Sequence, residues 1–309
     1  MKKIVYACLI CMINFILLTG CSSSPNSKSE NTDLPLRDNS PKVLETIPLD
    51  DHVEESEVVS LYLSNVSKGY IMFVYKGSNE KVKLQITGPD EVTYTYLVTD
   101  CKEPTAFPLA GGNGEYMFNL YESVDAENNK YYMAYSYNYE VTIEDEFLPY
   151  LSPNVYVNFT SESNCVAKGV ELAANCYSDL DVIEEVYNYV ISNVIYDTEE
   201  AKDVAYGYIP NPDEVLATNK GICFDYASLM TAMLRSQNIP TKLEVGYAGE
   251  VYHAWISCYV DEIGWVANII QFDGENWSLM DPTLASNNNS AEVQEYIGDG
   301  SKYVVKYTY

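Results

Sequence analysis

The stretch Gly221-Ile222-Cys223-Phe224-Asp225-Tyr226-Ala227 decides how the rest of the chain is interpreted. From Cys223 to Gln237 the residues are helix formers without Gly or Pro, and Asn238-Ile239-Pro240 ends the pattern. This predicts a helix with Cys223 in its first turn. The positive end of a helix favours the thiolate, the form of cysteine that attacks carbon. Cys223 is therefore a candidate nucleophile, and the alternative is an inert, buried cysteine.

A strand with a histidine follows about thirty residues later. Residues 252–260 are aromatic and β-branched, which is typical of a strand, and alternation puts His253 and Trp255 on one face. The chain has 2 histidines, and His52 lies in a polar segment, so His253 is the plausible catalytic imidazole. A short strand from Trp277 to Met280 then ends at Pro282, with Asp281 at its tip. A cysteine, a histidine and an aspartate thus follow one another in order.

These segments together resemble the transglutaminase-like superfamily, which is related to papain-type thiol enzymes. The resemblance covers roughly residues 150 to 309. It implies a catalytic triad of Cys223, His253 and Asp281, with the cysteine on a helix and its partners on neighbouring strands. Tyr226 and Trp255 are expected in the core or the substrate pocket. The resemblance rests on Gly221-Ile222-Cys223, Tyr226-Ala227, the helix end from Leu234 to Pro240, Gly246-Tyr247, His253-Ala254-Trp255 and Asp281-Pro282-Thr283.

Such a triad implies a thiol acyltransferase or peptidase that acts on amide bonds. Cys223 would attack the carbonyl to form a thioester, His253 would move the proton, and Asp281 would fix the imidazole tautomer. The backbone N–H of Cys223 would hold the oxyanion with a second donor that stays open. Whether an amine or water accepts the acyl group also stays open. The sequence contains no paired Cys/His spacing for zinc and no EF-hand loop, so we expect no metal and no cofactor.

The N-terminus predicts export and a lipid anchor. Lys2-Lys3 and the apolar run from Ile4 to Leu18 have the features of a secretory signal, and Leu18-Thr19-Gly20-Cys21 resembles the lipobox of bacterial lipoproteins. Residues 1–20 would then be a signal peptide, and Cys21 would be lipidated. Residues 21–56 are rich in Ser, Asn, Pro and acids, which predicts a disordered tether. The expected location is outside the cytoplasm, on the bacterial cell membrane.

The charge of the chain excludes a nucleic-acid partner. The formal net charge is −27, and removing residues 1–20 takes away two lysines, which leaves 45 acids against 16 bases, about −29. Such a chain repels nucleic acid and anionic headgroups, so contact with the membrane would come from the lipid. We expect a protein or peptide as substrate.

Residues 57–147 have the pattern of an antiparallel β-sandwich, because short β-rich runs alternate with turns such as Gly88-Pro89-Asp90. The whole chain contains 29 tyrosines, and many of them lie in this segment. Tyrosines can fill a pleated sheet or present an adhesive face. A non-catalytic binding or adhesion lipoprotein is therefore the alternative to the enzyme.

Residues 148–309 are expected to form the second domain and to fold alone. Two helical stretches, residues 163–176 and 180–193, precede a long loop to Thr218, whose Tyr206 and Tyr208 are candidates for lining the active site. The Cys223 helix should pack on a sheet built from residues 241–248, 252–260, 277–280 and 303–309. The predicted fold class is α+β, with a sandwich followed by a transglutaminase-like domain.

Overall fold

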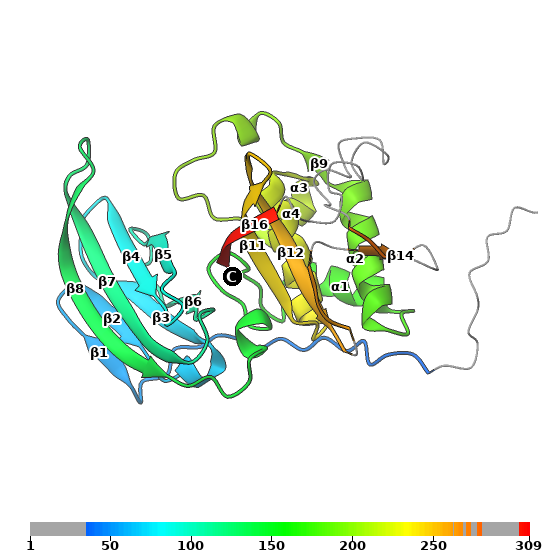
Figure 1. The fold of residues 1–309 in the computed structure, drawn as a ribbon, viewed down its shortest axis with the longest axis horizontal. Helices are drawn as coiled ribbons and strands as arrows, with labels where there is room; N and C mark the ends of the chain where they lie inside the picture. Colours follow the sequence, from blue (N-terminus) through cyan, green and yellow to red (C-terminus); the bar gives the residue numbers. More distant parts are fainter. Residues whose placement is uncertain (1–34, 262, 268–269, 273–276, 280–302) are drawn as a thin grey trace, which may run out of the picture. The chain divides into compact units, whose positions relative to one another are not determined.

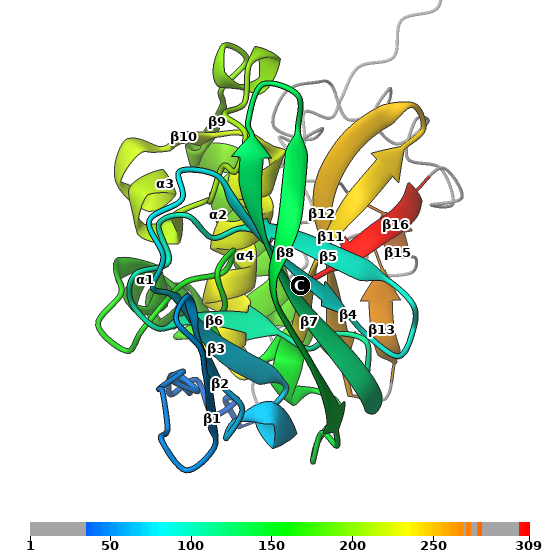
Figure 2. The same ribbon diagram turned by 90° about the vertical axis from the view of Figure 1, so that its left-hand side faces the viewer.

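Antiparallel strands build the first half of the folded chain (Figures 1 and 2). This computed structural model describes residues 35–261, 263–267, 270–272, 277–279 and 303–309. Two four-stranded sheets have the orders β1-β2-β3-β6 and β5-β4-β7-β8, and together they form the predicted sandwich. The strands are β1 (Val53–Glu55), β2 (Val59–Tyr62), β3 (Tyr70–Tyr75), β4 (Val82–Thr87), β5 (Thr93–Leu97), β6 (Thr105–Pro108), β7 (Gly114–Asp125) and β8 (Lys130–Val141).

Alternation explains how these strands face the core. In β4, Val82, Leu84 and Ile86 are buried, whereas the residues between them are partly exposed. Strands β1 and β6 were not expected from the sequence. Both are short, and β6 takes the outer position beside β3, where pairing rather than composition defines it.

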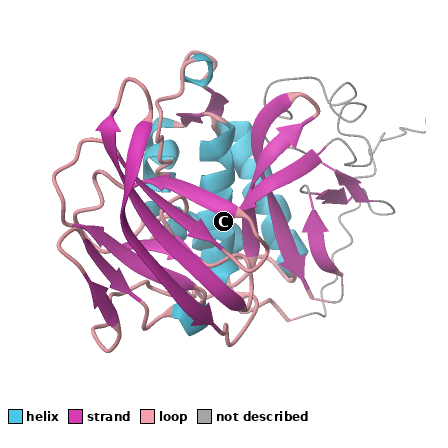
Figure 3. Cartoon of the chain, turned by 60° about the vertical axis from the view of Figure 1, so that its left-hand side comes forward, coloured by secondary structure: helices cyan, strands magenta, loops and turns pink. Residues whose placement is uncertain are grey.

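Four α-helices and a second antiparallel sheet form the other half of the described chain (Figure 3). The sheet has the order β13-β12-β11-β16, and α4 packs against β11, β12 and the other three helices. None of the described helices is long and apolar enough to cross a membrane. The elements are α1 (Asn164–Ala173), α2 (Asp179–Asn193), α3 (Pro212–Thr218), α4 (Cys223–Ser236), β11 (Thr241–Ala248), β12 (Val251–Val260), β13 (Gly264–Ala267) and β16 (Tyr303–Thr308).

The remaining elements are short. A parallel pair, β9 (Ile195–Tyr196) and β10 (Lys220–Gly221), leads into α4. Single 3₁₀ turns in the described ranges are η1 (Val66–Lys68), η2 (Leu148–Tyr150) and η3 (Glu200–Lys202).

The position of the strand predicted at residues 277–280 differs from the expectation. Residues 277–280 were expected to join the main sheet, but β15 (Trp277–Leu279) pairs with β14 (Ile270–Phe272) in a hairpin of its own. The reason is that β13 directly follows β12 and takes the edge of β12 that β11 leaves open.

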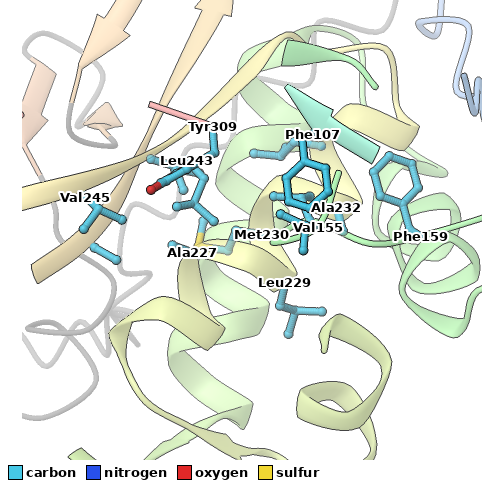
Figure 4. Packing of buried hydrophobic residues seen from close by; sticks show 14 of the residues in the cluster. Phe107, Val155, Phe159, Ala227, Leu229, Met230, Ala232, Leu243, Val245 and Tyr309 are labelled. Atoms are coloured by element: carbon cyan, nitrogen blue, oxygen red, sulfur yellow. The ribbon is translucent and has the colours of Figure 1, made fainter. Parts of the chain in front are cut away.

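Helix α4 is the centre of the core, because only its first two residues are not buried. Figure 4 shows Ala227 and Met230 of this helix near Leu243 and Tyr309. The polar side chains of α4 point into the protein as well. Arg235 is fully buried and donates to the backbone oxygens of Ser152, Thr241 and Tyr309, at 2.6 to 3.0 Å.

These bonds matter because burial lowers the pKa of Arg235 to about 9. That value still leaves the guanidinium charged in neutral solution, so the carbonyl oxygens replace the water that the charge has lost. Arg235 thereby connects α4 to β11, to the segment before α1 and to Tyr309 after β16.

One hydrophobic core continues through both halves of the described chain. Tyr156 lies 5.7 Å from Tyr96 of β5, between ring centroids, and Tyr309 lies 5.5 Å from Tyr94. The backbone N–H of Val155 also donates to the carbonyl of Ala106 at 2.9 Å. The sandwich therefore packs against Val155, Tyr156 and Tyr309.

The expected tether is ordered in its second part. Residues 35–52, which we call the strap, have no helix or strand, but they lie against the folded chain. Arg37 pairs with Asp179 and donates to the carbonyl of Gln237, and the N–H of Lys42 donates to the carbonyl of Ser236 at 2.7 Å. From Pro35 onward, the segment that the sequence predicts to be a tether therefore has partners at the start of α2 and at the end of α4.

Candidate active site

Cys223 is the first residue of α4 and is half-buried. Ile222 before it has extended backbone, so the helix begins abruptly. The backbone N–H groups of Cys223 and Phe224 donate to no acceptor within the described part of the chain. Free N–H groups and the positive end of the helix dipole therefore surround the thiol, as the sequence led us to expect.

Asp225 fixes this helix start. Its carboxylate is almost fully buried and accepts the N–H of Ile222 and the hydroxyl of Tyr208, both at 2.8 Å. Burial raises the pKa of Asp225, and these two hydrogen bonds act in the opposite direction. Gly221 is needed before the helix because a Cβ atom at this position would lie 2.6 Å from the Cβ of Asp225.

His253 is buried near the beginning of β12, opposite Gly246 of β11. It shares a face with Trp255, and the two ring centroids are 6.2 Å apart. The carboxylate of Glu244 accepts from Trp255 Nε1 at 2.8 Å and from the Ser257 hydroxyl at 2.6 Å. Burial raises the pKa of Glu244. His253 therefore lies beside a hydrogen-bonded group, on the face of β12 opposite to Ala254 and Ile256, which share the core with α4.

The first turn of α4 lies near the same end of β12. Burial raises the pKa of Tyr252 first, and Tyr307, Tyr247 and the charge of Cys223 raise it further. Tyr252 is therefore within electrostatic range of the thiol. Tyr252 and His253 are consecutive residues, and neighbouring Cα atoms are about 3.8 Å apart. The backbone of His253 therefore lies at the same end of β12.

Residues 167–268 match the sequence model of the transglutaminase-like superfamily. This part of the chain is similar to that superfamily. The matched segment contains α4 and β12, and thus both Cys223 and His253.

Curated relatives of this domain extend well beyond the region that they share with the chain. UPF0252 protein MJ1282 of Methanocaldococcus jannaschii is 32% identical over 91 residues, which are 26% of this chain and 26% of that protein. Uncharacterized protein YebA of Bacillus subtilis is 23% identical over 256 residues, 69% of this chain and 34% of that protein. The chain therefore spans about a quarter and about a third of their lengths.

The periplasmic domain of TgpA from Pseudomonas aeruginosa is a solved structure with some likeness. It is 16% identical and has a TM-score of 0.33, over 68% of this chain and 91% of that one. A TM-score of this size indicates a distant likeness only.

Asp281 and Cys21 lie outside the described residues. Two of the three predicted pocket residues are buried. Tyr226 is fully buried and donates to the carbonyl of Val194 at 2.6 Å, and Trp255 is buried on Glu244. Tyr208 does reach the start of α4, through its bond to Asp225.

Tyr252 was not among the residues expected at the site, because the expectation for β12 rested on the face that carries His253. An aromatic residue directly before His253 was the available signal in the sequence.

The other described cysteines differ from Cys223. Cys101, Cys165, Cys176 and Cys258 are all buried, and burial raises the pKa of each of them, to about 11 for Cys176 and about 12 for Cys258. In the ranges that the structure describes, no group of His, Cys, Asp and Glu could hold a metal ion. A cavity of about 500 Å³ lies between Leu97, Val155 and Tyr206, and Cys223 does not line it.

Proposed function

We propose that the transglutaminase-like domain is a thiol enzyme in which Cys223 attacks an amide carbonyl. The supporting observation is the placement of Cys223, the one described cysteine that is not buried, at the start of a helix. His253 takes the thiol proton and returns it to the leaving amine, and Asp281 orients the imidazole. The carbon–nitrogen bond breaks, a thioester forms, and an amine or water then releases the acyl group.

The helix start supplies a site for the developing oxyanion. The N–H groups of Cys223 and Phe224 are unpaired among the described residues, so either can donate to an oxygen that approaches the thiol. Asp225 and Tyr208 hold this turn in place and do not react themselves. The substrate is a protein or peptide amide, and both acyl transfer and hydrolysis fit this arrangement.

Alkylation will test the nucleophile. Iodoacetamide at neutral pH should modify Cys223 first, because the other four described cysteines are buried thiols with raised pKa values. The label should be located by peptide mass spectrometry. The rate at Cys223 should fall several-fold in His253→Ala, since the imidazole no longer takes the proton. If Cys223 reacts no faster than Cys258 in the native protein, it is not an activated thiol.

We also propose that Cys21 carries a lipid anchor. The strap binds at Ser236 and Gln237, the opposite end of α4 from Cys223. At about 1.5 Å per residue, the two ends of this helix are about 20 Å apart. Anchoring through the residues before the strap therefore leaves the Cys223 end on the side away from the attachment point.

Replacing the lipidated residue will test the anchor. Cys21→Ser should move the protein from the membrane fraction to the soluble fraction or leave its signal uncleaved, since acylation needs the thiol. Immunoblots of fractionated cells give the distribution, with Cys101→Ser as the control. A processed Cys21→Ser protein that still sediments with membranes would refute the lipoprotein assignment.

One observation favours the alternative of a binding or adhesion protein. Strand β8 is at the edge of its sheet, and its Tyr132 and Met133 are exposed, as is Val124 of β7. An exposed apolar edge of this kind can hold a partner strand. An inert Cys223 in the alkylation experiment would support this function over the enzyme.

A further inference from the structure

Three exposed apolar side chains form a row across the sheet that packs on α4. Tyr252 of β12 is directly opposite Tyr247 of β11, which is opposite Val304 of β16. They are 57%, 41% and 50% exposed. Since directly paired residues point to the same face of a sheet, all three side chains lie on one face (the order of the strands is visible in Figure 1).

This face is the one that α4 covers further along the strands. Ala254 and Ile256, two and four residues after Tyr252, are buried in the core that contains α4. In β11, Val245 and Leu243, two and four residues before Tyr247, are buried in the same core. The row therefore continues the α4-facing surface beyond the end of the helix, at the point where Cys223 starts it. The electrostatic effect of Cys223 on Tyr252 agrees with this placement.

The two tyrosine rings are already arranged as a pair. Their centroids are 5.5 Å apart and the rings are inclined by 69°, an edge-to-face geometry. The hydroxyls of both residues have no described hydrogen-bond partner, so no bond among the described residues fixes the rings for a structural purpose. Edge-to-face pairs leave one ring face open to a third apolar group.

We propose that Tyr252 and Tyr247 are specificity-determining residues, which bind an aromatic or branched aliphatic side chain of the polypeptide next to the amide that Cys223 attacks. This inference rests on the proposed function and names the substrate class. A large apolar side chain would cover the exposed rings, whereas a small or acidic one would not. The preference should be about tenfold, which corresponds to one well-packed aromatic contact.

Two alkylating probes of different size will measure this preference without a known substrate. The full chain is treated with iodoacetamide and with N-benzyl iodoacetamide, and the rate at Cys223 is followed by mass spectrometry. The rate with N-benzyl iodoacetamide is divided by the rate with iodoacetamide. This ratio is then divided by the same ratio measured for N-acetylcysteine, which corrects for the intrinsic reactivity of the two probes. In the wild-type protein we expect a normalised ratio of about ten in favour of the benzyl probe. In Tyr252→Ala it should fall to about one.

Tyr252→Phe should keep the ratio, because the ring and not the hydroxyl makes the contact. The matched control is Tyr177→Ala, which removes an exposed tyrosine before α2 and should also keep the ratio. A wild-type ratio near one overturns the inference, and so does an unchanged ratio in Tyr252→Ala. If Cys223 reacts with neither probe faster than the buried cysteines, the proposed function fails and the inference fails with it. If Cys223 is reactive but its normalised ratio is about one, the inference fails and the proposed function stands.

Discussion

Replacing Cys223 by serine should abolish turnover of an amide substrate and leave the folded protein nearly unchanged. Serine has almost the volume of cysteine, and Cys223 is only half-buried, so the free energy of unfolding should change by no more than about 1–2 kcal/mol. The hydroxyl is a far weaker nucleophile than a thiolate without the arrangement of a serine triad. Activity on an identified peptide and a thermal melt of the same sample measure the two effects.

Variants of His253 and Asp281 should differ in their activity in the same assay. His253 is buried, so His253→Gln is a better test than alanine, because it fills most of the space and cannot act as a base. Its activity should fall to the level of Cys223→Ser. Asp281→Asn should leave a slower enzyme, since the amide still bonds to the imidazole but favours the wrong tautomer.

Combining these changes should cost little more than one alone, because triad residues act as a unit. Cys101→Ser is the control for a cysteine outside the site and should keep full turnover. Wild-type activity in Cys223→Ser would exclude the thiol mechanism. Collapsed melts in all three triad variants would instead mean that these residues mainly build the core.

The local parts of the fold could be predicted from the sequence. The helix was expected over residues 223–237 and is found over Cys223–Ser236, because Gly221 before it and Pro240 after it are signals within a few residues. Strand β12 begins one residue before the expected position, since its aromatic and β-branched composition is continuous. Cys223 could be singled out for the same reason, as its chemistry depends on the helix start.

Features that depend on distant partners could not be predicted. The strap has the composition of a disordered segment, but it bonds to distant partners, among them Asp179 of α2 and the carbonyl groups at the end of α4. Arg235 is part of a polar stripe in the sequence, and its acceptors are backbone oxygens, which composition does not reveal. Tyr252 shares its strand with His253 but points to the other face, so its proximity to Cys223 follows only from the way α4 packs on the sheet.

The separation of the two halves is the feature for which the structure changes the expectation most. We now expect residues 148–309, expressed alone, to lack a cooperative unfolding transition. In the full chain, Tyr94 and Tyr96 of the sandwich cover Tyr156 and Tyr309, and Val155 is buried beside them. Exposing a large buried side chain costs about 1.5–3 kcal/mol, so losing the cover of Val155 and Tyr309 alone removes roughly 3–6 kcal/mol. This is a large part of the stability of a typical domain, about 5–15 kcal/mol.

Urea unfolding followed by circular dichroism will test this expectation on three proteins. They are the fragment 148–309, residues 35–309, and residues 35–309 with Tyr94→Ala. The point variant removes one ring from the junction and should lower the midpoint while keeping a single transition, because the rest of the shared core remains. The fragment should change its signal gradually, without a midpoint. Adding the separate sandwich, residues 53–147, should restore part of the transition if the missing core surface is the cause. A steep transition in the fragment alone, with the slope expected for its size, would show that the second half has a sufficient core of its own.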